Sequence, residues 1–278
     1  MMLIDGRAQR SLSARDRGLH FGDGLFETIA VDAGRALCLE RHLARLADGC
    51  ACLAIPAPEL ALLEEECARV CDGVEERAVL KIMITRGVSG RGFRPDPGAV
   101  PTRIVARYPW PPYPADSRTD GVAVRICNTR LGRNPRLAGI KHLNRLEQVL
   151  ARSEDELAQY AEGLMLDDRG RLIEGIMSNV FVRRGKRLST PDLSECGVAG
   201  IMRGLVLEAS EQATGLAPEI TALGVDDLST AEECFLTNSL IGIWPIKTLA
   251  GQPLRTGPAA HALLKLLTER GAIVRDCP

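Results

Sequence analysis

One lysine stands in a stretch whose residue types could support covalent chemistry. Residues 139–153 read GIKHLNRLEQVLARS, and Lys141 is one of only five lysines among the 35 basic residues of the chain. Arginine keeps its charge in proteins, whereas a lysine amine can lose its proton when it is buried. The apolar neighbours Ile140 and Leu143 favour such desolvation, and a neutral amine can condense with a carbonyl group. Taken alone, Lys141 could equally be a solvated surface residue near a helix start.

Three other segments carry groups that a carbonyl-bearing phosphate cofactor, such as pyridoxal phosphate, would need. Glu174, in LIEGIMSN, ends an expected strand and could face a pyridine nitrogen. CGVAGIMR places Gly200 before a helix that begins near Ile201, and the free N–H groups at such a helix start suit a phosphate. Arg45 lies on an expected amphipathic helix and could bind a phosphate bidentately. Each group also has an ordinary explanation: a solvated hairpin carboxylate, a glycine-led helix start and a surface arginine.

The composition excludes several classes of function. The chain has 278 residues with a net charge of −1, which does not favour a nucleic acid or an anionic membrane as partner. It has no apolar run of membrane-spanning length and no signal-peptide pattern. Nine cysteines without a disulfide framework predict free thiols and a cytoplasmic location. Two close cysteine pairs lack a matching second pair of ligands, so we interpret them as packing and predict no metal site; they are Cys50 with Cys52 and Cys67 with Cys71.

The elements that must position these residues indicate a mixed α/β chain in two parts. Periodicity and turn residues predict strands at 2–5, 78–85, 102–108, 121–127 and 233–238, hairpins at 162–175 and 178–190, and helices at 40–53, 59–71, 142–158, 200–213 and 258–271. Between two of these strands, VSGRGFRPDPG predicts a mobile loop. The four prolines of PWPPYPADSRTD favour an extended connection. We therefore predict a smaller N-terminal α/β domain at 1–112, a linker at 113–120 and a larger cofactor-binding domain at 121–278.

Longer segments resemble the fold-type IV pyridoxal-phosphate family, which includes the branched-chain and D-amino-acid aminotransferases. The resemblance spans nearly the whole chain, through RGLHFGDGLFET, RHLARL, LGRNPRLAGIKHLNRLEQVLARS, EGIMSNVF, TPDLSECGVAGIMR and FLTNSLIGIWPI. FGDG and the helix start at residue 201 belong to the wider family, whereas LGRNPRLAGIKHLNRLEQVLARS is similar to its lyase branch, the aminodeoxychorismate lyases. The resemblance implies an α/β (α+β) fold of two domains, with pyridoxal 5'-phosphate at the domain interface.

The same resemblance implies roles for individual residues. Lys141 would hold the cofactor and move a proton, and Glu174 would face the pyridine nitrogen. The residues implied for the cofactor phosphate are Arg45, Ile201, Met202 and Ser239. Those implied at the substrate are Thr28 for proton handling, Asn238 for substrate contact, and Arg91 and Arg107 for the substrate carboxylates. Tyr160 falls where the aminotransferases keep a tyrosine near the phenolic oxygen of the cofactor.

The implied activity is the conversion of 4-amino-4-deoxychorismate to 4-aminobenzoate and pyruvate, a step of folate biosynthesis. The implied assembly is a homodimer in which loop 87–98 reaches towards the neighbouring subunit, and we expect no nucleic-acid or membrane partner. One alternative is an aminotransferase of the same fold that acts on branched-chain or D-amino acids. Another is a non-catalytic binding protein on this fold, which would need a lost lysine or a broken phosphate cradle, whereas the chain retains both.

Overall fold

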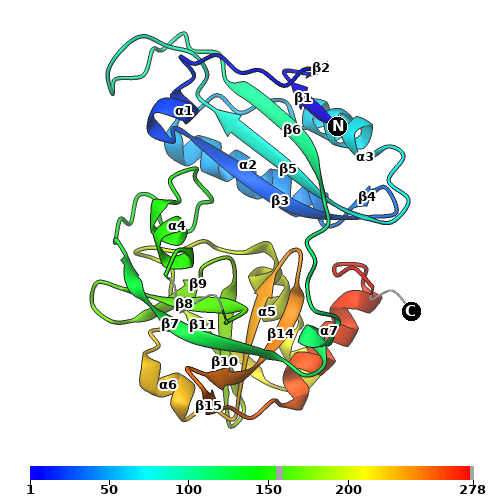
Figure 1. Cartoon of the computed structure of the whole chain (residues 1–278), viewed down its shortest axis with the longest axis vertical. Coiled ribbons are helices and arrows are strands. Elements are labelled where there is room, and N and C mark those ends of the chain that lie inside the picture. The colour runs from blue at the N-terminus through cyan, green and yellow to red at the C-terminus, as the bar shows by residue number, and fades with distance from the viewer. Residues whose placement is uncertain (155–158, 276–278) are drawn as a thin grey trace. The chain divides into compact units, whose positions relative to one another are not determined.

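The computed structural model describes residues 1–154 and 159–275, and the chain divides into two compact units. The first unit is Met1–Pro111 with Ile140–Asn144, and the second is Pro112–Gly139 with Arg145–Pro278. Each unit combines a β-sheet with helices (Figure 1), which confirms the predicted mixed α/β class. The segment that carries Lys141 groups with the first unit, although the predicted boundaries placed it in the C-terminal domain.

The first unit is built on a six-stranded antiparallel sheet in the order β2-β1-β6-β5-β3-β4. Its elements are β1 (Met2–Ile4), β2 (Arg7–Ala8), α1 (Arg17–Phe21), β3 (Gly24–Asp32), β4 (Arg35–Ala36), α2 (Leu39–Leu53), α3 (Leu60–Cys71), β5 (Arg77–Thr85) and β6 (Thr102–Pro109). The predicted helices at 40–53 and 59–71 and the predicted strands at 78–85 and 102–108 are confirmed.

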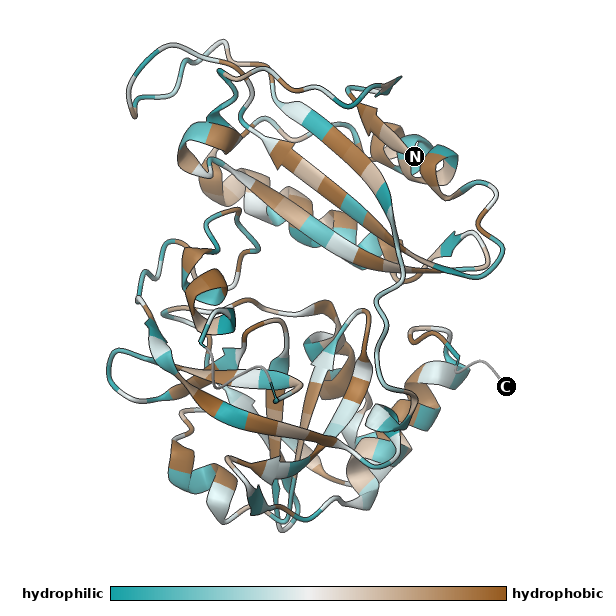
Figure 2. Cartoon of the chain, viewed as in Figure 1, coloured by the Kyte–Doolittle hydropathy of each residue, from teal (hydrophilic) through white to brown (hydrophobic). Residues whose placement is uncertain are grey.

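Alternation along β3 and β5 separates two faces of this sheet. Leu25, Ile29, Leu80 and Ile82 are buried on one face, where they pack with apolar residues of α2 and α3 in one core. Hydrophobic residues are concentrated in the strands and hydrophilic residues in the connecting loops (Figure 2). We call the face covered by α2 and α3 the helix face and the opposite face the open face.

The second unit contains a nine-stranded sheet in the described residues, in the order β12-β11-β10-β13-β14-β7-β8-β9, with β15 paired to β14. Its elements are the 3-10 helix η1 (Ala115–Arg118), β7 (Val122–Leu131), α4 (Leu146–Arg152), β8 (Glu162–Asp167), β9 (Leu172–Gly175), β10 (Asn179–Arg184), β11 (Arg187–Pro191), α5 (Ile201–Thr214), β12 (Ala217–Thr221), α6 (Val225–Ser229), β13 (Glu233–Asn238), β14 (Gly242–Leu249), β15 (Gln252–Pro253) and α7 (Pro258–Glu269). Strands β8 and β9 pair antiparallel, and so do β10 and β11, which confirms both predicted hairpins.

The predicted helix at 142–158 is shorter in the structure, where α4 spans Leu146–Arg152. Its predicted first turn is instead extended, because Phe26 N donates to Lys141 O (3.0 Å) and Leu143 N donates to Gly24 O (2.9 Å). Pairing with β3 therefore takes the backbone groups that a helix would use. Residues 155–158 of the predicted helix lie outside the described residues.

Residues 113–120, predicted as a linker, group with the second unit. Arg118 is buried there, and its guanidinium donates to Ile241 O (3.0 Å) and Val274 O (2.8 Å). These two hydrogen bonds hold the segment on the second unit. The predicted domain boundaries at 1–112 and 121–278 stay a prediction.

Eight of the nine cysteines lie in the described residues, and all eight are free thiols; Cys277 lies outside them. Cys50, Cys67 and Cys71 belong to the core of the first unit, and burial raises the pKa of the Cys67 thiol to about 12. Packing therefore accounts for these three residues, whereas Cys52, which was also interpreted as packing, is exposed. No helix among the described residues is long and apolar enough to cross a membrane.

Candidate active site

Lys141 lies on the open face of the first unit. Its neighbour His142 forms a bridge with Leu25 of β3, and the main chain of Lys141 pairs with Phe26. Because residues that pair directly share a face of a sheet, the Lys141 side chain lies beside Phe26. Its Nζ is 4.5 Å from the centroid of the Phe26 ring, a distance suited to a cation–π contact.

The glycines of FGDG explain how the Lys141 segment comes so close to β3. Gly22 has a φ of +61°, and a Cβ there would lie 2.6 Å from Asn144 Oδ1. A Cβ on Gly24 would lie 2.4 Å from Ile84 O and 2.8 Å from Leu143 Cδ1. Both distances are too short for a real side chain. The two glycines therefore leave the space in which the segment after Lys141 is seated.

Thr28 and a second lysine share the open face with Lys141. Thr28 pairs directly with Lys81 of β5, and Lys81 Nζ lies 5.2 Å from the centroid of the Phe26 ring. Two amines thus approach one aromatic side chain. Lys81 was absent from the predicted site residues, although the alternation of AVLKIMIT places it on the face opposite the core. That alternation could have identified Lys81 as a candidate site residue.

Arg45 projects from α2 towards a buried carboxylate on the helix face. Arg45 Nε lies 2.8 Å from Glu27 Oε1 and Nη2 lies 2.5 Å from Oε2, while His42 Nδ1 lies 2.6 Å from the same Oε2. Burial raises the pKa of Glu27, but hydrogen bonds from His42 and Arg45 outweigh it, so the pKa lies below its usual value. Burial lowers the pKa of His42 despite its bond to Glu27. The cluster therefore combines an ionised carboxylate, a neutral imidazole and a guanidinium held by two bonds.

The two arginines predicted for the substrate carboxylates lie in different places. Arg107 pairs with Leu80 and so lies on the helix face, where its Nη1 donates to Asp72 O (3.1 Å). The structure does not bring Arg107 to the open face with Lys141. Arg91 lies in the loop between β5 and β6, at the wall of a cavity of about 300 Å³. The other residues lining this cavity are Arg15, Arg17, His20, Phe21, Ser89, Gly90 and Gly92.

In the second unit, Glu174 is a buried carboxylate next to the last residue of β9. Its Oε2 accepts a hydrogen bond from Val198 N (2.8 Å). Gly197 has a φ of +90°, and a Cβ there would lie 2.8 Å from Ile173 Cγ2 and 3.3 Å from Glu174 Oε2. Glycine at 197 thus allows the loop before α5 to lie against Glu174, and the loop in turn fixes one carboxylate oxygen.

The same loop leads into α5, which begins at Ile201 without a side-chain cap. The first four N–H groups of a helix have no partner within it, and they can bind an anion. A Cβ on Gly200 would lie 2.1 Å from Asn179 Oδ1, and Asn179 Nδ2 donates to Val198 O (2.9 Å). Asn179 therefore fixes the helix start, and the structure brings it together with Glu174 through residues 197–200. Met202 is buried in this first turn.

Asn238 stands at the end of β13, and Ser239 follows it in the turn. Asn238 Oδ1 accepts from Leu240 N (2.8 Å) and Ile241 N (2.9 Å), and its Nδ2 donates to Met177 O (3.0 Å). The carboxamide thus shapes the turn and joins it to the loop after Glu174. The substrate contact of Asn238 and the phosphate contact of Ser239 stay predictions. Tyr160 packs beside the cluster that contains Met165 and Ile173, and its cofactor contact also stays a prediction.

Comparison with known proteins places the chain in a family. Residues 24–249 match the model of the family described as amino-transferase class IV. The chain is 33% identical over 250 residues to the aminodeoxychorismate lyase of Vibrio harveyi, covering 90% of this chain and 92% of that protein. The chain therefore belongs to the class IV aminotransferase family, whose members depend on pyridoxal phosphate.

Two solved structures have the same fold. The structure of 4-amino-4-deoxychorismate lyase from Pseudomonas aeruginosa is 45% identical, with a TM-score of 0.91, covering 97% of this chain and 98% of that one. A hypothetical aminotransferase from Mycobacterium tuberculosis, solved in a pyridoxal-phosphate-bound form, is 25% identical, with a TM-score of 0.84 and coverage of 99% of both chains. These similarities confirm the predicted fold-type IV architecture.

Proposed function

We propose that the chain is a lyase that converts 4-amino-4-deoxychorismate to 4-aminobenzoate and pyruvate with the help of pyridoxal 5'-phosphate. The similarity to lyases from two bacteria supports this activity. The observation that carries the chemistry is Lys141, whose main chain is fixed beside β3 and whose amine lies against Phe26 on the open face. A lysine held in this way has a defined position for its amine.

The residues of each unit fit the groups of the cofactor by their chemistry. Lys141 would bind its aldehyde, and two candidates for its phosphate are Arg45, which is paired with Glu27 in the first unit, and the uncapped start of α5 in the second unit. The buried Glu174 would hold a proton at its pyridine nitrogen. When bound, the cofactor supplies an electron sink that makes a proton next to the substrate amine acidic.

Lys141 would then act as the base of the reaction. Its amine would take the proton from C4 of the substrate ring, and Thr28 on the same face would help to transfer that proton. The bond between the ring carbon C3 and the enolpyruvyl oxygen would break, and enolpyruvate would leave, take up a proton in place of the one removed from C4 and become pyruvate. The ring becomes aromatic, which makes the reaction strongly downhill. The backbone pairing of residues 141–143 with β3 would fix the direction from which the base approaches.

The substrate carries two carboxylates, so its recognition needs cations. Lys81 lies on the open face with Lys141 and Thr28, and its amine approaches the same Phe26 ring as that of Lys141. It is therefore our candidate for binding one substrate carboxylate. Arg91 stays a proposal for the second carboxylate. Arg107 lies on the helix face, where its Nη1 donates to Asp72 O, and its substrate role stays a prediction.

The aminotransferases of the family are the second candidate, because they would use the same lysine. We expect this chain to release pyruvate and 4-aminobenzoate in equal amounts from 4-amino-4-deoxychorismate without any keto acid. Added 2-oxoglutarate should not change the rate or yield glutamate, as measured by chromatography of the products. Glutamate formation at a rate matching or exceeding pyruvate release would contradict the lyase function and favour the aminotransferase.

We also propose that the chain works as a homodimer in the cytoplasm. Its eight described free thiols support a reducing compartment. Phe93 and Val100, in or beside the loop between β5 and β6, are 85% and 78% exposed, which suits contact with a second copy. Light scattering of the active protein should give twice the mass of one chain, 30.1 kDa. A fully active monomer would contradict this prediction.

A further inference from the structure

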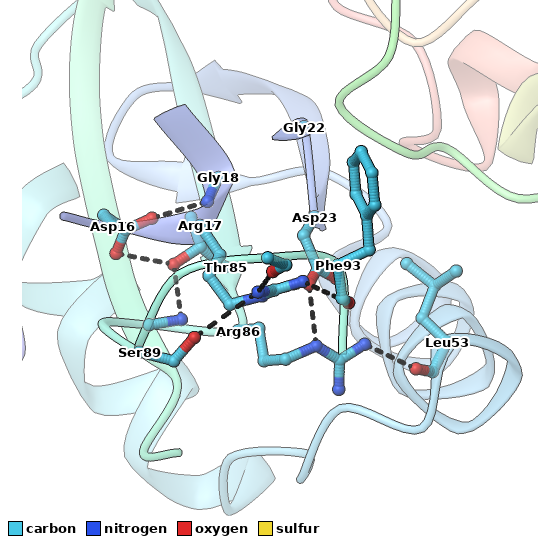
Figure 3. Close-up of polar contacts among 12 residues, drawn as sticks. Asp16, Arg17, Gly18, Gly22, Asp23, Leu53, Thr85, Arg86, Ser89 and Phe93 are labelled. Atoms are coloured by element: carbon cyan, nitrogen blue, oxygen red, sulfur yellow. Dashed lines mark hydrogen bonds and ion pairs between the residues drawn. The ribbon is translucent and has the colours of Figure 1, made fainter. Parts of the chain in front are cut away.

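Arg17 is a buried arginine that binds the loop between β5 and β6. Only 3% of the residue is exposed. Its Nη1 donates to Gly92 O (2.9 Å), its Nη2 donates to Phe93 O (3.0 Å), and its Nε donates to Asp23 Oδ2 (2.8 Å) (Figure 3). A buried guanidinium is tolerated when its charge and its N–H groups are paired in this way. The planar guanidinium of Arg17 thus binds the Asp23 carboxylate and two successive carbonyl groups of the loop.

Asp23 is the aspartate of FGDG, and it holds Arg17 together with a second arginine. Its Oδ2 also accepts from Arg86 Nε (2.8 Å) (Figure 3). Burial raises the pKa of Asp23, but hydrogen bonds from Arg86 and Arg17 outweigh it, so the pKa is lowered. Arg86 turns away from the loop tip, because its other nitrogens donate to Leu53 O (2.7 Å) and Ala54 O (2.8 Å) at the end of α2. The two arginines therefore share one carboxylate but hold different segments.

Aromatic and hydroxyl contacts secure the loop on both sides of this ion pair. The Arg17 guanidinium carbon lies 4.8 Å from the centroid of the Phe21 ring, and the Phe21 and Phe93 rings are 5.4 Å apart. At the stem, the buried Asp16 accepts from the hydroxyls of Thr85 (2.9 Å) and Thr102 (3.0 Å). The stem is thus fixed by Asp16 and the tip by Arg17.

We propose that Arg17 is a positioning residue that fixes the backbone of residues 89–93 and, through it, the point from which the exposed Arg91 side chain extends. Arg91 stands between Gly90 and Gly92, and Gly92 has a φ of +93°. Glycines on both sides give this tip many conformations in the absence of a clamp. That the fixed Arg91 raises affinity for the substrate rests on the function proposed above.

Limited proteolysis tests the clamp independently of the reaction. Trypsin prefers exposed and flexible loop tips, so the rate of cleavage at the exposed Arg91–Gly92 bond should follow the population in which the tip is released from Arg17. In the purified full-length holoenzyme, Arg17→Gln should be cut at this bond at least about tenfold faster than the parent, as followed by mass spectrometry. Arg86→Gln is the matched control, because it removes a bond to the same Asp23 oxygen but no contact with the tip. Parent-like cleavage of Arg17→Gln, or equal acceleration by both variants, would overturn the proposal.

Steady-state kinetics test the consequence for the substrate. Arg17→Gln should raise KM about tenfold with kcat nearly unchanged, and Arg91→Ala should raise KM as well. If Arg91→Ala raises KM and Arg17→Gln does not, the positioning of Arg91 by Arg17 is overturned while the proposed function stands. If neither raises KM, the assignment of Arg91 fails and the inference falls with it. If the parent protein releases no pyruvate from 4-amino-4-deoxychorismate, the proposed function fails. The proteolysis result does not depend on that activity.

Discussion

Replacement of Lys141 by alanine should give a folded protein that has lost its activity. The main-chain bonds of residues 141–143 to β3 do not involve the amine, so the segment should keep its place. The substitution also removes the cation–π interaction with Phe26, which stabilises the fold by only about 0.5–2 kcal/mol. The variant should lack the visible absorbance band of bound cofactor. Its rate of pyruvate release should fall by at least about 10²–10⁴-fold, the usual contribution of a positioned base.

Lys141→Arg is the matched control for charge at this position. A guanidinium keeps the positive charge and can remain over the Phe26 ring, but it neither bonds to an aldehyde nor takes a proton near neutral pH. The arginine variant should therefore be as inactive as the alanine variant, with a melting temperature close to that of the parent. Parent-like turnover by either variant would show that Lys141 is not the base.

Glu174→Gln should lower the chemical rate while leaving substrate affinity nearly unchanged. The amide oxygen of glutamine can still accept from Val198 N, so the loop before α5 should keep its position. A neutral amide cannot stabilise a proton at the pyridine nitrogen as a carboxylate does. Removing an interaction that strengthens as charge develops lowers kcat without a matching rise in KM. We expect pyruvate release in a single turnover at saturating cofactor to slow by about 10²-fold.

Arg45→Ala provides the contrast to Glu174→Gln. It removes the guanidinium that is paired with Glu27 and proposed for the cofactor phosphate, so cofactor affinity should fall. Excess pyridoxal phosphate should restore much of the rate of Arg45→Ala but none of the rate of Glu174→Gln. Parent-like single-turnover release by Glu174→Gln would remove that carboxylate from the site. Parent-like release is the result expected if Glu174 has no role at the cofactor.

Much of the fold could be predicted because its signals are local. Helical spacing of apolar residues predicts α2 and α3, and alternation predicts β5 and β6. The strand β14 was missed because Pro245 lies inside it, and a proline usually argues against a strand interior. The start of the predicted helix at 142 was wrong because HLNRLEQVLARS suits a helix throughout, whereas the first residues pair with a strand more than a hundred positions away.

Some residues of the candidate site could also be predicted from the sequence, and others could not. Lys141, Glu174 and the helix start at residue 201 could be proposed because each stands in a short motif with a chemical purpose. The side on which Arg107 projects follows from its strand register with Leu80, which the predicted elements did not resolve, whereas the alternation of AVLKIMIT could have placed Lys81 opposite the core. The role of Asp23 could not be predicted either. Its partners Arg17 and Arg86 bind carbonyl groups that are distant in sequence, so only the folded chain shows that FGDG supports a loop.

Reduction with borohydride tests the central claim most directly, because it fixes the cofactor to the lysine that holds it. The purified protein should lose its visible absorbance band on reduction, and peptide mass spectrometry should find the pyridoxyl group on Lys141. Lys81 is the internal control, since its amine approaches the same Phe26 ring. Modification of Lys141 alone is the predicted result. A pyridoxyl group on Lys81, or on no lysine of an active protein, would contradict the account.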